Sequence, residues 1–267
     1  MATAPLFVVA LCELGAPIEV EEEPFAAILG VTTYDARTRA TGTLPKIVHQ
    51  AATMDEALHV AEALRRRGHG AVAFDANDAL ALDRMVTMRR FSVDGETLFA
   101  HDKRPPSRQL SELLVIVRLV LHQHVQRTQT EVEYRYTNRG AVRVAVDRTS
   151  GENHAEDALV LFFDGGPPWS LRAREAKYLA LGARIRPTVR ENFFATAEWL
   201  RAVAGSAVYD ERFVSTPLVS ARLADVRGHG DPALRSDRLS DLRLHALGAW
   251  LSRGRHGPYR AAGRREA

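Results

Sequence analysis

Residues 44–75 read LPKIVHQAATMDEALHVAEALRRRGHGAVAFD and contain the strongest helix signal in the chain. Thr53 and Glu56 have the spacing of a capping box, in which the threonine hydroxyl accepts from the Glu56 amide and the carboxylate accepts from the Thr53 amide. Apolar residues then recur at helical spacing, arginines face the negative end of the helix dipole, and Gly68 suits a left-handed stop. The pattern predicts a helix at residues 54–67.

Shorter elements are expected on both sides of this helix. An apolar run near the N-terminus has the length of a strand. Pro24 follows acidic residues, which is typical of the start of a helix, and this helix would end near Gly30. The predicted elements are strands at residues 6–13, 46–50 and 70–75 and helices at residues 24–30 and 34–39.

This order of elements resembles the small α/β sandwich folds of the ribosomal stalk protein's C-terminal domain, of ClpS and of ferredoxin-like modules. The resemblance is carried by residues 44–75: a strand that follows a proline, a capped amphipathic helix, a glycine stop and a final strand. In these folds the module usually binds a partner or an effector. The resemblance therefore implies that residues 1–78 form a small α/β binding module, and it transfers no binding residue to this sequence.

Beyond the first module the apolar pattern changes to a period of two, which is typical of antiparallel strands. Asp94 and Gly95 separate two such runs and predict a hairpin. Residues 114–136 predict either two strands or one long bent strand, and a strand at 141–147 is expected to end in a turn at 149–152. The remaining predicted elements are strands at 158–163 and 169–174 and a helix at 188–204.

Antiparallel strands closed by one C-terminal amphipathic helix resemble a bacterial pleckstrin-homology-like domain. The resemblance spans residues 84–204 and is carried by the hairpin at Asp94, the strand of Trp169 and the helix of Phe193 and Trp199. That family consists mainly of binding platforms for proteins, peptides and sometimes lipids. The resemblance implies the fold class α+β: a small α/β sandwich followed by an antiparallel β-rich domain that a helix closes.

The sequence predicts four segments in all. An α/β module at residues 1–78 precedes the β-rich domain at 84–205, a C-terminal extension at 206–251 and a basic tail at 252–267. Leucines at helical spacing predict a helix at 236–251 within the extension. Arginines among glycines predict that the tail is disordered.

The composition is that of a globular protein, with 46% hydrophobic and 26% charged residues. Cys12 is the only cysteine, and its place in an apolar run predicts a buried, inert thiol. Because the N-terminus lacks the pattern of a signal peptide and no apolar run is long enough to span a bilayer, we expect a cytoplasmic protein. The net charge is +3, and arginine far outnumbers lysine. The codon bias of a GC-rich bacterial genome explains such an excess of arginine.

His122 and His124 are the candidate metal ligands. Two histidines at this spacing share one face of a strand and could present two nitrogens to one metal ion. A third ligand could come from His101, Asp102 or Glu131. We favour the simpler interpretation of two surface or half-buried histidines on a sheet, because no further ligand occurs at a conventional metal spacing.

Other catalytic chemistry has little support in the sequence. Asp210 and Glu211, with Arg212 beside them, could form an acid/base pair, but neighbouring side chains usually diverge, which favours a loop-capping or salt-bridging role. No nucleophile elbow, phosphate loop or dinucleotide fingerprint occurs, so no cofactor is predicted.

Arginines near the end of the first long helix and in the basic tail are the candidate contacts for an anion. The guanidinium fork suits phosphate oxygens, and each such contact makes binding sensitive to salt. We favour the interpretation that these arginines complement a helix dipole or keep the tail soluble. They are Arg65, Arg66, Arg67, Arg253, Arg255, Arg260, Arg264 and Arg265.

The leading interpretation is a non-enzymatic interaction or adaptor protein of the bacterial cytoplasm that binds a protein or peptide partner. One alternative is a metal-assisted hydrolase that uses His122 and His124. Another alternative is a protein that binds nucleic acid or an anionic lipid surface through its arginine-rich tail.

Overall fold

The computed structural model describes residues 6–101, 106–137, 140–219 and 236–253. Within these ranges it describes the backbone without the side chain at 83, 123–137, 140–154, 217, 219, 236 and 237. The described chain contains helices together with antiparallel and mixed sheets, which confirms the α+β class. In this part of the chain, no helix combines the length and the apolar character that a membrane crossing requires.

The N-terminal part of the chain forms a three-stranded antiparallel sheet with the strand order β2-β1-β3. Its elements are β1 (Phe7–Glu13), α1 (Ile18–Leu29), α2 (Thr33–Ala40), β2 (Lys46–Ala51), α3 (Met54–Arg66) and β3 (Gly70–Asp75). Side chains alternate along a strand, so β1 serves two cores. Val9 and Leu11 pack with Phe25 and Leu64 beneath the three helices, on one face of the sheet.

Helix α3 confirms the helix predicted from the capping pattern, although the cap differs in one bond. The Thr53 hydroxyl accepts from the Glu56 amide at 3.2 Å, as expected. The Glu56 carboxylate accepts from the amide of Ala52 at 3.1 Å, and not from that of Thr53. Gly68 has a φ of 87°, the left-handed conformation that the sequence predicts after the helix.

Helix α1 starts earlier than the sequence predicts. It begins at Ile18, so the start predicted at Pro24 was wrong and the proline lies inside the helix. The acidic residues that complement the helix dipole are Glu19 and Glu21 in the first turn. The predicted end is confirmed, because Gly30 caps the helix in the left-handed conformation with a φ of 65°.

The middle of the chain forms a six-stranded mixed sheet with the order β11-β8-β9-β10-β4, in which β12 also pairs with β8. The strands are β4 (Val86–Thr87), β8 (Leu113–Thr137), β9 (Gly140–Phe163), β10 (Trp169–Arg172), β11 (Val208–Glu211) and β12 (Thr216–Val219). The neighbours β8, β9 and β10 are antiparallel, which confirms the predicted pairing of the strand at 158–163 with the strand that starts at Trp169. The other three strands join in parallel.

A second three-stranded sheet, with the order β5-β6-β7, shares a core with α4. These elements are β5 (Phe91–Asp94), β6 (Thr97–Ala100), β7 (Ser107–Gln109) and α4 (Val189–Val203). The predicted hairpin is confirmed, with Gly95 at a φ of 56° between β5 and β6. Thr188 and Glu191 form a complete capping box at the start of α4. The short helices are η1 (Ala76–Asp78), η2 (Leu82–Arg84), η3 (Leu110–Glu112), η4 (Tyr178–Arg184) and α5 (Arg212–Ser215).

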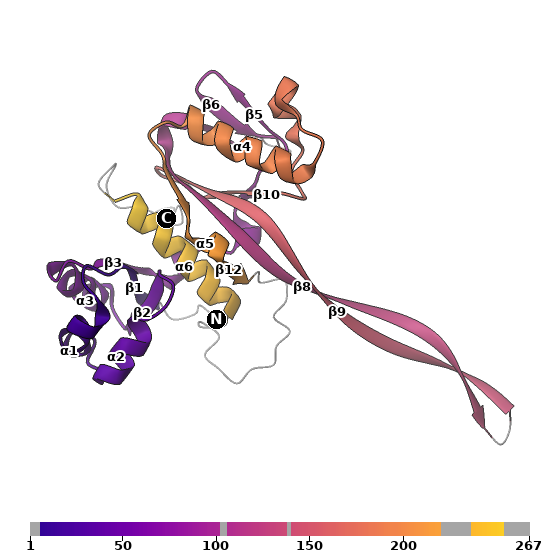
Figure 1. Cartoon of the computed structure of the whole chain (residues 1–267), viewed down its shortest axis with the longest axis horizontal. Coiled ribbons are helices and arrows are strands. Elements are labelled where there is room, and N and C mark those ends of the chain that lie inside the picture. The colour runs from indigo at the N-terminus through magenta and orange to yellow at the C-terminus, as the bar shows by residue number, and fades with distance from the viewer. Residues whose placement is uncertain (1–5, 102–105, 138–139, 220–235, 254–267) are drawn as a thin grey trace, which may run out of the picture.

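Helix α6 (Ser236–Leu251), which the sequence predicts within a C-terminal extension, joins the two halves of the molecule (Figure 1). Leu242 and Ala246 pack against β1 and β3, on the face of the first sheet opposite to α1, α2 and α3. Leu244 and Leu247 belong to a different core, which is built on β8 and β9. One helix therefore lies between two sheets and contributes to both cores.

Strands β8 and β9 continue beyond the rest of the sheet as a long two-stranded ribbon (Figure 1). Their pairing ends with Thr137 opposite Gly140. The described part of strand β12 pairs with β8 as far as His122, and β10 pairs with β9 nearer the body of the molecule. In the described backbone, residues 123–137 and 140–154 therefore pair only with each other.

The ribbon resolves one sequence prediction and corrects another. Residues 114–136 belong to one strand, which was one of the two expected arrangements. The turn predicted at 149–152 was wrong, because β9 continues through it with Thr149 opposite Thr128 and Gly151 opposite Gln126. Pairing along the whole of β8 outweighs the local turn preference of these small residues.

Candidate binding groove beside strand β2

Strand β2 lies at the edge of the N-terminal sheet. It pairs with β1 on one side, and no described strand pairs with its other side. The pairing is irregular near Val48, where the register shifts between Val9 and Ala10. An edge strand presents backbone N–H and C=O groups to whatever lies beside it.

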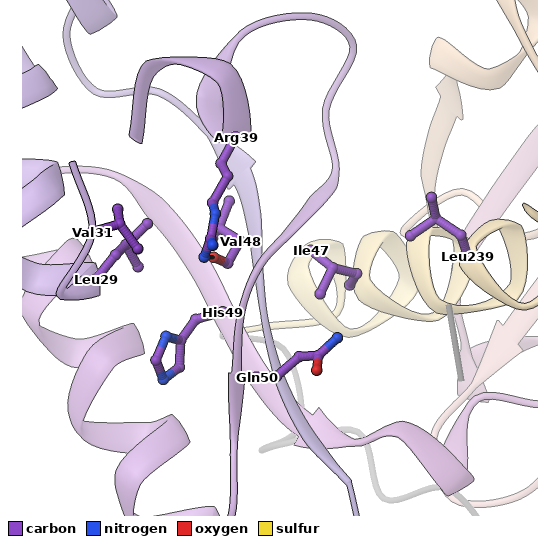
Figure 2. Close-up of a pocket in the computed structure, with 8 residues that line it drawn as sticks. All are labelled: Leu29, Val31, Arg39, Ile47, Val48, His49, Gln50 and Leu239. Carbon is purple, nitrogen blue, oxygen red and sulfur yellow. Dashed lines mark hydrogen bonds between the residues drawn. The ribbon is translucent and has the colours of Figure 1, made fainter. Parts of the chain in front are cut away.

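A groove of about 710 Å³ lies along this edge. Leu29 and Val31, from the end of α1 and the turn after it, lie on one side of β2 (Figure 2). Ile47 of β2 and Leu239 of α6 lie on the other side. The full lining is Leu29, Val31, Arg39, Ile47, Val48, His49, Gln50 and Leu239.

A smaller cleft of about 280 Å³ continues the groove, because the two share Arg39, Ile47 and Leu239. Its other lining residues are Thr43, Lys46, Thr216 and Arg243. Three of the lining residues are cationic and none is acidic. We call this the basic cleft, and its cations are Arg39 of α2, Lys46 of β2 and Arg243 of α6.

Arg243 is held in the basic cleft by backbone carbonyls and by an aromatic ring. Its Nε donates to the Pro45 carbonyl at 2.8 Å, and its Nη2 donates to the Thr43 carbonyl at 3.1 Å. The guanidinium lies 5.3 Å from the centre of the Phe213 ring. These contacts hold the residues that directly precede β2 against α6.

Lys46 and Arg39 are also held by carbonyl oxygens. The Lys46 ammonium donates to the carbonyls of Thr38, at 3.3 Å, and of Thr41. The Arg39 Nη1 donates to the Val48 carbonyl at 2.9 Å, which lies on the edge strand itself. Among the described residues, no carboxylate forms an ion pair with any of the three cations.

Burial and mutual repulsion make the positive charges of the basic cleft unfavourable. Burial, and then repulsion from the Arg243 guanidinium, lowers the pKa of Lys46. Burial also lowers the pKa of Arg243. Positive charge is therefore concentrated here, and the described residues supply no carboxylate as the negative partner that usually accompanies a partly buried cation.

His49 adds a polar group to the groove. Its Nε2 is buried and has no hydrogen-bond partner in the described part of the chain, and the nearest carboxylate oxygen, Oε1 of Glu56, is 3.6 Å away. The imidazole points to the side of Leu29 and Val31, whereas the side chain of Gln50 points to the other side of the strand (Figure 2).

The structure describes four of the arginines that were predicted to contact an anion, and two of these meet at one carbonyl oxygen. The Arg65 Nε and the Arg253 Nη1 both donate to the carbonyl of Ala71, at 2.8 and 3.0 Å. Arg67 pairs with the carboxylate of Glu21, with its Nε at 2.5 Å. Arg66 is exposed on α3. The remaining predicted residues, Arg255, Arg260, Arg264 and Arg265, lie outside the described residues.

The predicted metal ligands are placed only in part. His122 is exposed on β8, opposite Ala155, and the side chain of His124 lies outside the described part of the structure. Among the described side chains, no group of three or more His, Cys, Asp or Glu residues could hold a metal ion.

Two further side-chain predictions are confirmed. Cys12 is buried, and burial raises the pKa of its thiol to about 12, so that little thiolate forms near neutral pH. Asp210 pairs with Arg212 at 3.0 Å, and Glu211 pairs with Arg118 at 3.1 Å. The two carboxylates diverge into separate salt bridges.

The basic cleft was not predicted from the sequence. Its only local signal is the spacing of Leu239 and Arg243, which lie four residues apart and so share one face of a helix. The cleft forms when that face docks beside β2, and Thr43 and Arg243 are 200 residues apart in the sequence. No sequence pattern within one segment predicts a contact between residues so far apart in the chain.

Comparisons of the chain with protein-family models, with curated proteins and with solved structures find no match.

Proposed function

We propose that this chain is an interaction protein that binds an extended segment of a protein partner in the groove beside β2. The observation that carries the proposal is the edge strand β2, four of whose residues line a groove of about 710 Å³. An extended segment can add to an exposed sheet edge through main-chain hydrogen bonds while pockets beside the strand receive its side chains.

The lining of the groove suits such a segment. Leu29, Val31, Ile47 and Leu239 provide apolar surface on both sides of the strand. His49 and Gln50 provide one polar group on each side of the strand (Figure 2). Most sites that bind a ligand combine an apolar lining with a few polar groups that fix its orientation.

The edge is protected in the structure at the same place. Arg39 occupies the carbonyl of Val48, which limits unspecific pairing with other strands. A partner segment would replace this contact with a main-chain hydrogen bond.

The resemblances seen in the sequence support the same proposal. Small α/β modules like the one expected at 1–78 usually bind a partner or an effector, and the bacterial pleckstrin-homology-like family, which residues 84–204 resemble, consists mainly of binding platforms. We propose a protein or peptide partner for this chain, in the bacterial cytoplasm.

The test is selection of peptides on the full chain from a random display library, followed by hydrogen exchange with a selected peptide. We expect slower exchange of the amides at Lys46–Ala51 in the complex, because added main-chain bonds protect an edge strand. Val31→Glu and Leu239→Glu should each weaken binding at least about tenfold, since each places a charge in the apolar lining.

Matched controls are Val20→Glu and Leu179→Glu, which make the same chemical change at residues that are 68% and 78% exposed outside the groove. Both controls should bind like the unaltered chain. Protection confined to other strands, or equal loss of binding in the control variants, would refute the proposal.

A further inference from the structure

We propose that the basic cleft binds an oxyanion, a carboxylate or a phosphoryl group, that the partner segment carries. The inference rests on the proposed function, because it states the chemistry of the segment that the groove receives. It assigns the partner an acidic group at the position where the groove meets Arg39, Lys46 and Arg243.

Three cations from three different elements line the basic cleft. Arg39 comes from α2, Lys46 from the start of β2 and Arg243 from α6, and all three line one volume of about 280 Å³. The hydroxyls of Thr43 and Thr216 lie at the same cleft, 2.9 Å from each other. Cations and hydroxyls around one small volume are the donors that an oxyanion requires.

The cations retain donors for such a group. A guanidinium has five N–H groups and an ammonium has three. The hydrogen bonds of Arg243 to carbonyl oxygens use Nε and Nη2, and the bond of Arg39 uses Nη1. Carbonyl oxygens orient these cations without neutralising their charge.

A bound oxyanion would also relieve the repulsion between Lys46 and Arg243, which adds to the effect of burial in lowering the pKa of Lys46. Burial strengthens this attraction, because the cleft is less well solvated than the open surface. The favourable interaction is therefore available to a ligand and is not already satisfied by a carboxylate of the described chain.

Arg39 couples the two parts of the site. Its guanidinium occupies the Val48 carbonyl on the edge strand and also lines the basic cleft. When an oxyanion draws this guanidinium into the cleft, the Val48 carbonyl becomes available to an N–H of the partner. Anion binding and strand addition should therefore favour each other.

The first experiment measures thermal unfolding of the full chain in sodium phosphate and in sodium chloride at equal ionic strength. We expect a midpoint that rises with phosphate concentration and not with chloride. Lys46→Gln should abolish the rise, and Arg66→Gln, which removes an exposed charge outside the cleft, should leave it unchanged. An equal rise in Lys46→Gln, or an equal rise with chloride, would overturn the inference.

The second experiment sequences the peptides selected by the unaltered chain and by Lys46→Gln. We expect aspartate, glutamate or a terminal carboxylate at one fixed position in the first set and at least a tenfold weaker preference in the second. Arg39→Gln provides a second variant, because Arg243→Gln also removes the bonds that hold Thr43 and Pro45.

Peptides with phosphoserine, aspartate or serine at that position then identify the anion. Tighter binding of either charged peptide supports the inference, and the tighter of the two names the preferred group. If peptides bind in the groove with no preference for an acidic residue, the inference fails and the proposed function stands. If no peptide binds in the groove, the proposed function fails.

Discussion

His245 shows how one buried side chain can set the acid stability of the protein. The ring lies on α6, 4.6 Å from the ring of Phe74 on β3. Burial, and then repulsion from Arg238, lowers its pKa to about 4. The unfolded chain therefore takes up a proton at a higher pH than the folded chain does.

We expect stability to be fully present above the ordinary histidine pKa of 6.5 and to fall as the pH decreases toward 4. The loss that His245 contributes is on the order of 3 kcal/mol. Urea unfolding between pH 7 and pH 4 should show a smaller loss for His245→Gln than for the unaltered chain. His59→Gln, at an exposed position on α3, should follow the unaltered chain.

Gly248 gives a second prediction at the scale of the residue. A Cβ at this position on α6 would lie 2.4 Å from the Cε1 of Phe162, which is 1% exposed. Alanine normally stabilises a helix interior by about 1 kcal/mol relative to glycine. Here we expect Gly248→Ala to destabilise the protein by about 1 to 3 kcal/mol through overpacking.

The control for this substitution is Gly205→Ala, because the nearest atom to its Cβ is the carbonyl oxygen of Ala202 at 4.0 Å. Thermal or urea unfolding of both variants measures the difference. A Gly248→Ala protein that is as stable as the control would contradict the close contact between α6 and β9.

At the scale of the element, the β8–β9 ribbon should be separable from the rest of the fold. Replacing residues 123–154 by a two-residue Asn-Gly turn would join His122 to Ala155, which are register partners. We expect the free energy of unfolding to change by less than about 1 kcal/mol, because a lone two-stranded ribbon adds little stability in water. Urea unfolding and peptide binding to the groove should both resemble those of the full chain.

The elements themselves were predictable where local rules dominate. We could predict α3 from its capping pattern, its helical spacing and Gly68. Asp94 and Gly95 were sufficient to predict the β5–β6 hairpin. The start of α1 was missed because Pro24 suggests the first turn of a helix, whereas the helix already begins at Ile18, which packs in the N-terminal core. The continuity of β9 was missed because it depends on pairing with β8. The site could not be predicted because it depends on contacts between residues that are still further apart in the sequence. Lys46 and Arg243 come together only when α6 docks beside β2.

At the scale of the whole molecule, α6 should couple two cores that the sequence assigns to separate segments. Leu242 packs with the N-terminal sheet and Leu244 with β8 and β9. We expect Leu242→Ala and Leu244→Ala each to cost about 2 to 5 kcal/mol. Because the helix is shared, hydrogen exchange should accelerate in both β3 and the inner part of β8 for either variant. Acceleration confined to one sheet would contradict the coupling.

The ribbon also makes the whole molecule longer than its chain length suggests. A compact chain of 267 residues has a radius of gyration of about 18 Å. Solution X-ray scattering should give a larger value for the full chain, and the variant with the short turn should approach the compact value.

A protein with one long projection does not rotate equally about all of its axes. Rotation about the length of the ribbon displaces little water, whereas end-over-end rotation sweeps the tip through a wide arc. Fluorescence anisotropy decay and nuclear spin relaxation should therefore report two distinct correlation times for this small chain, and the slower one should disappear when the ribbon is shortened.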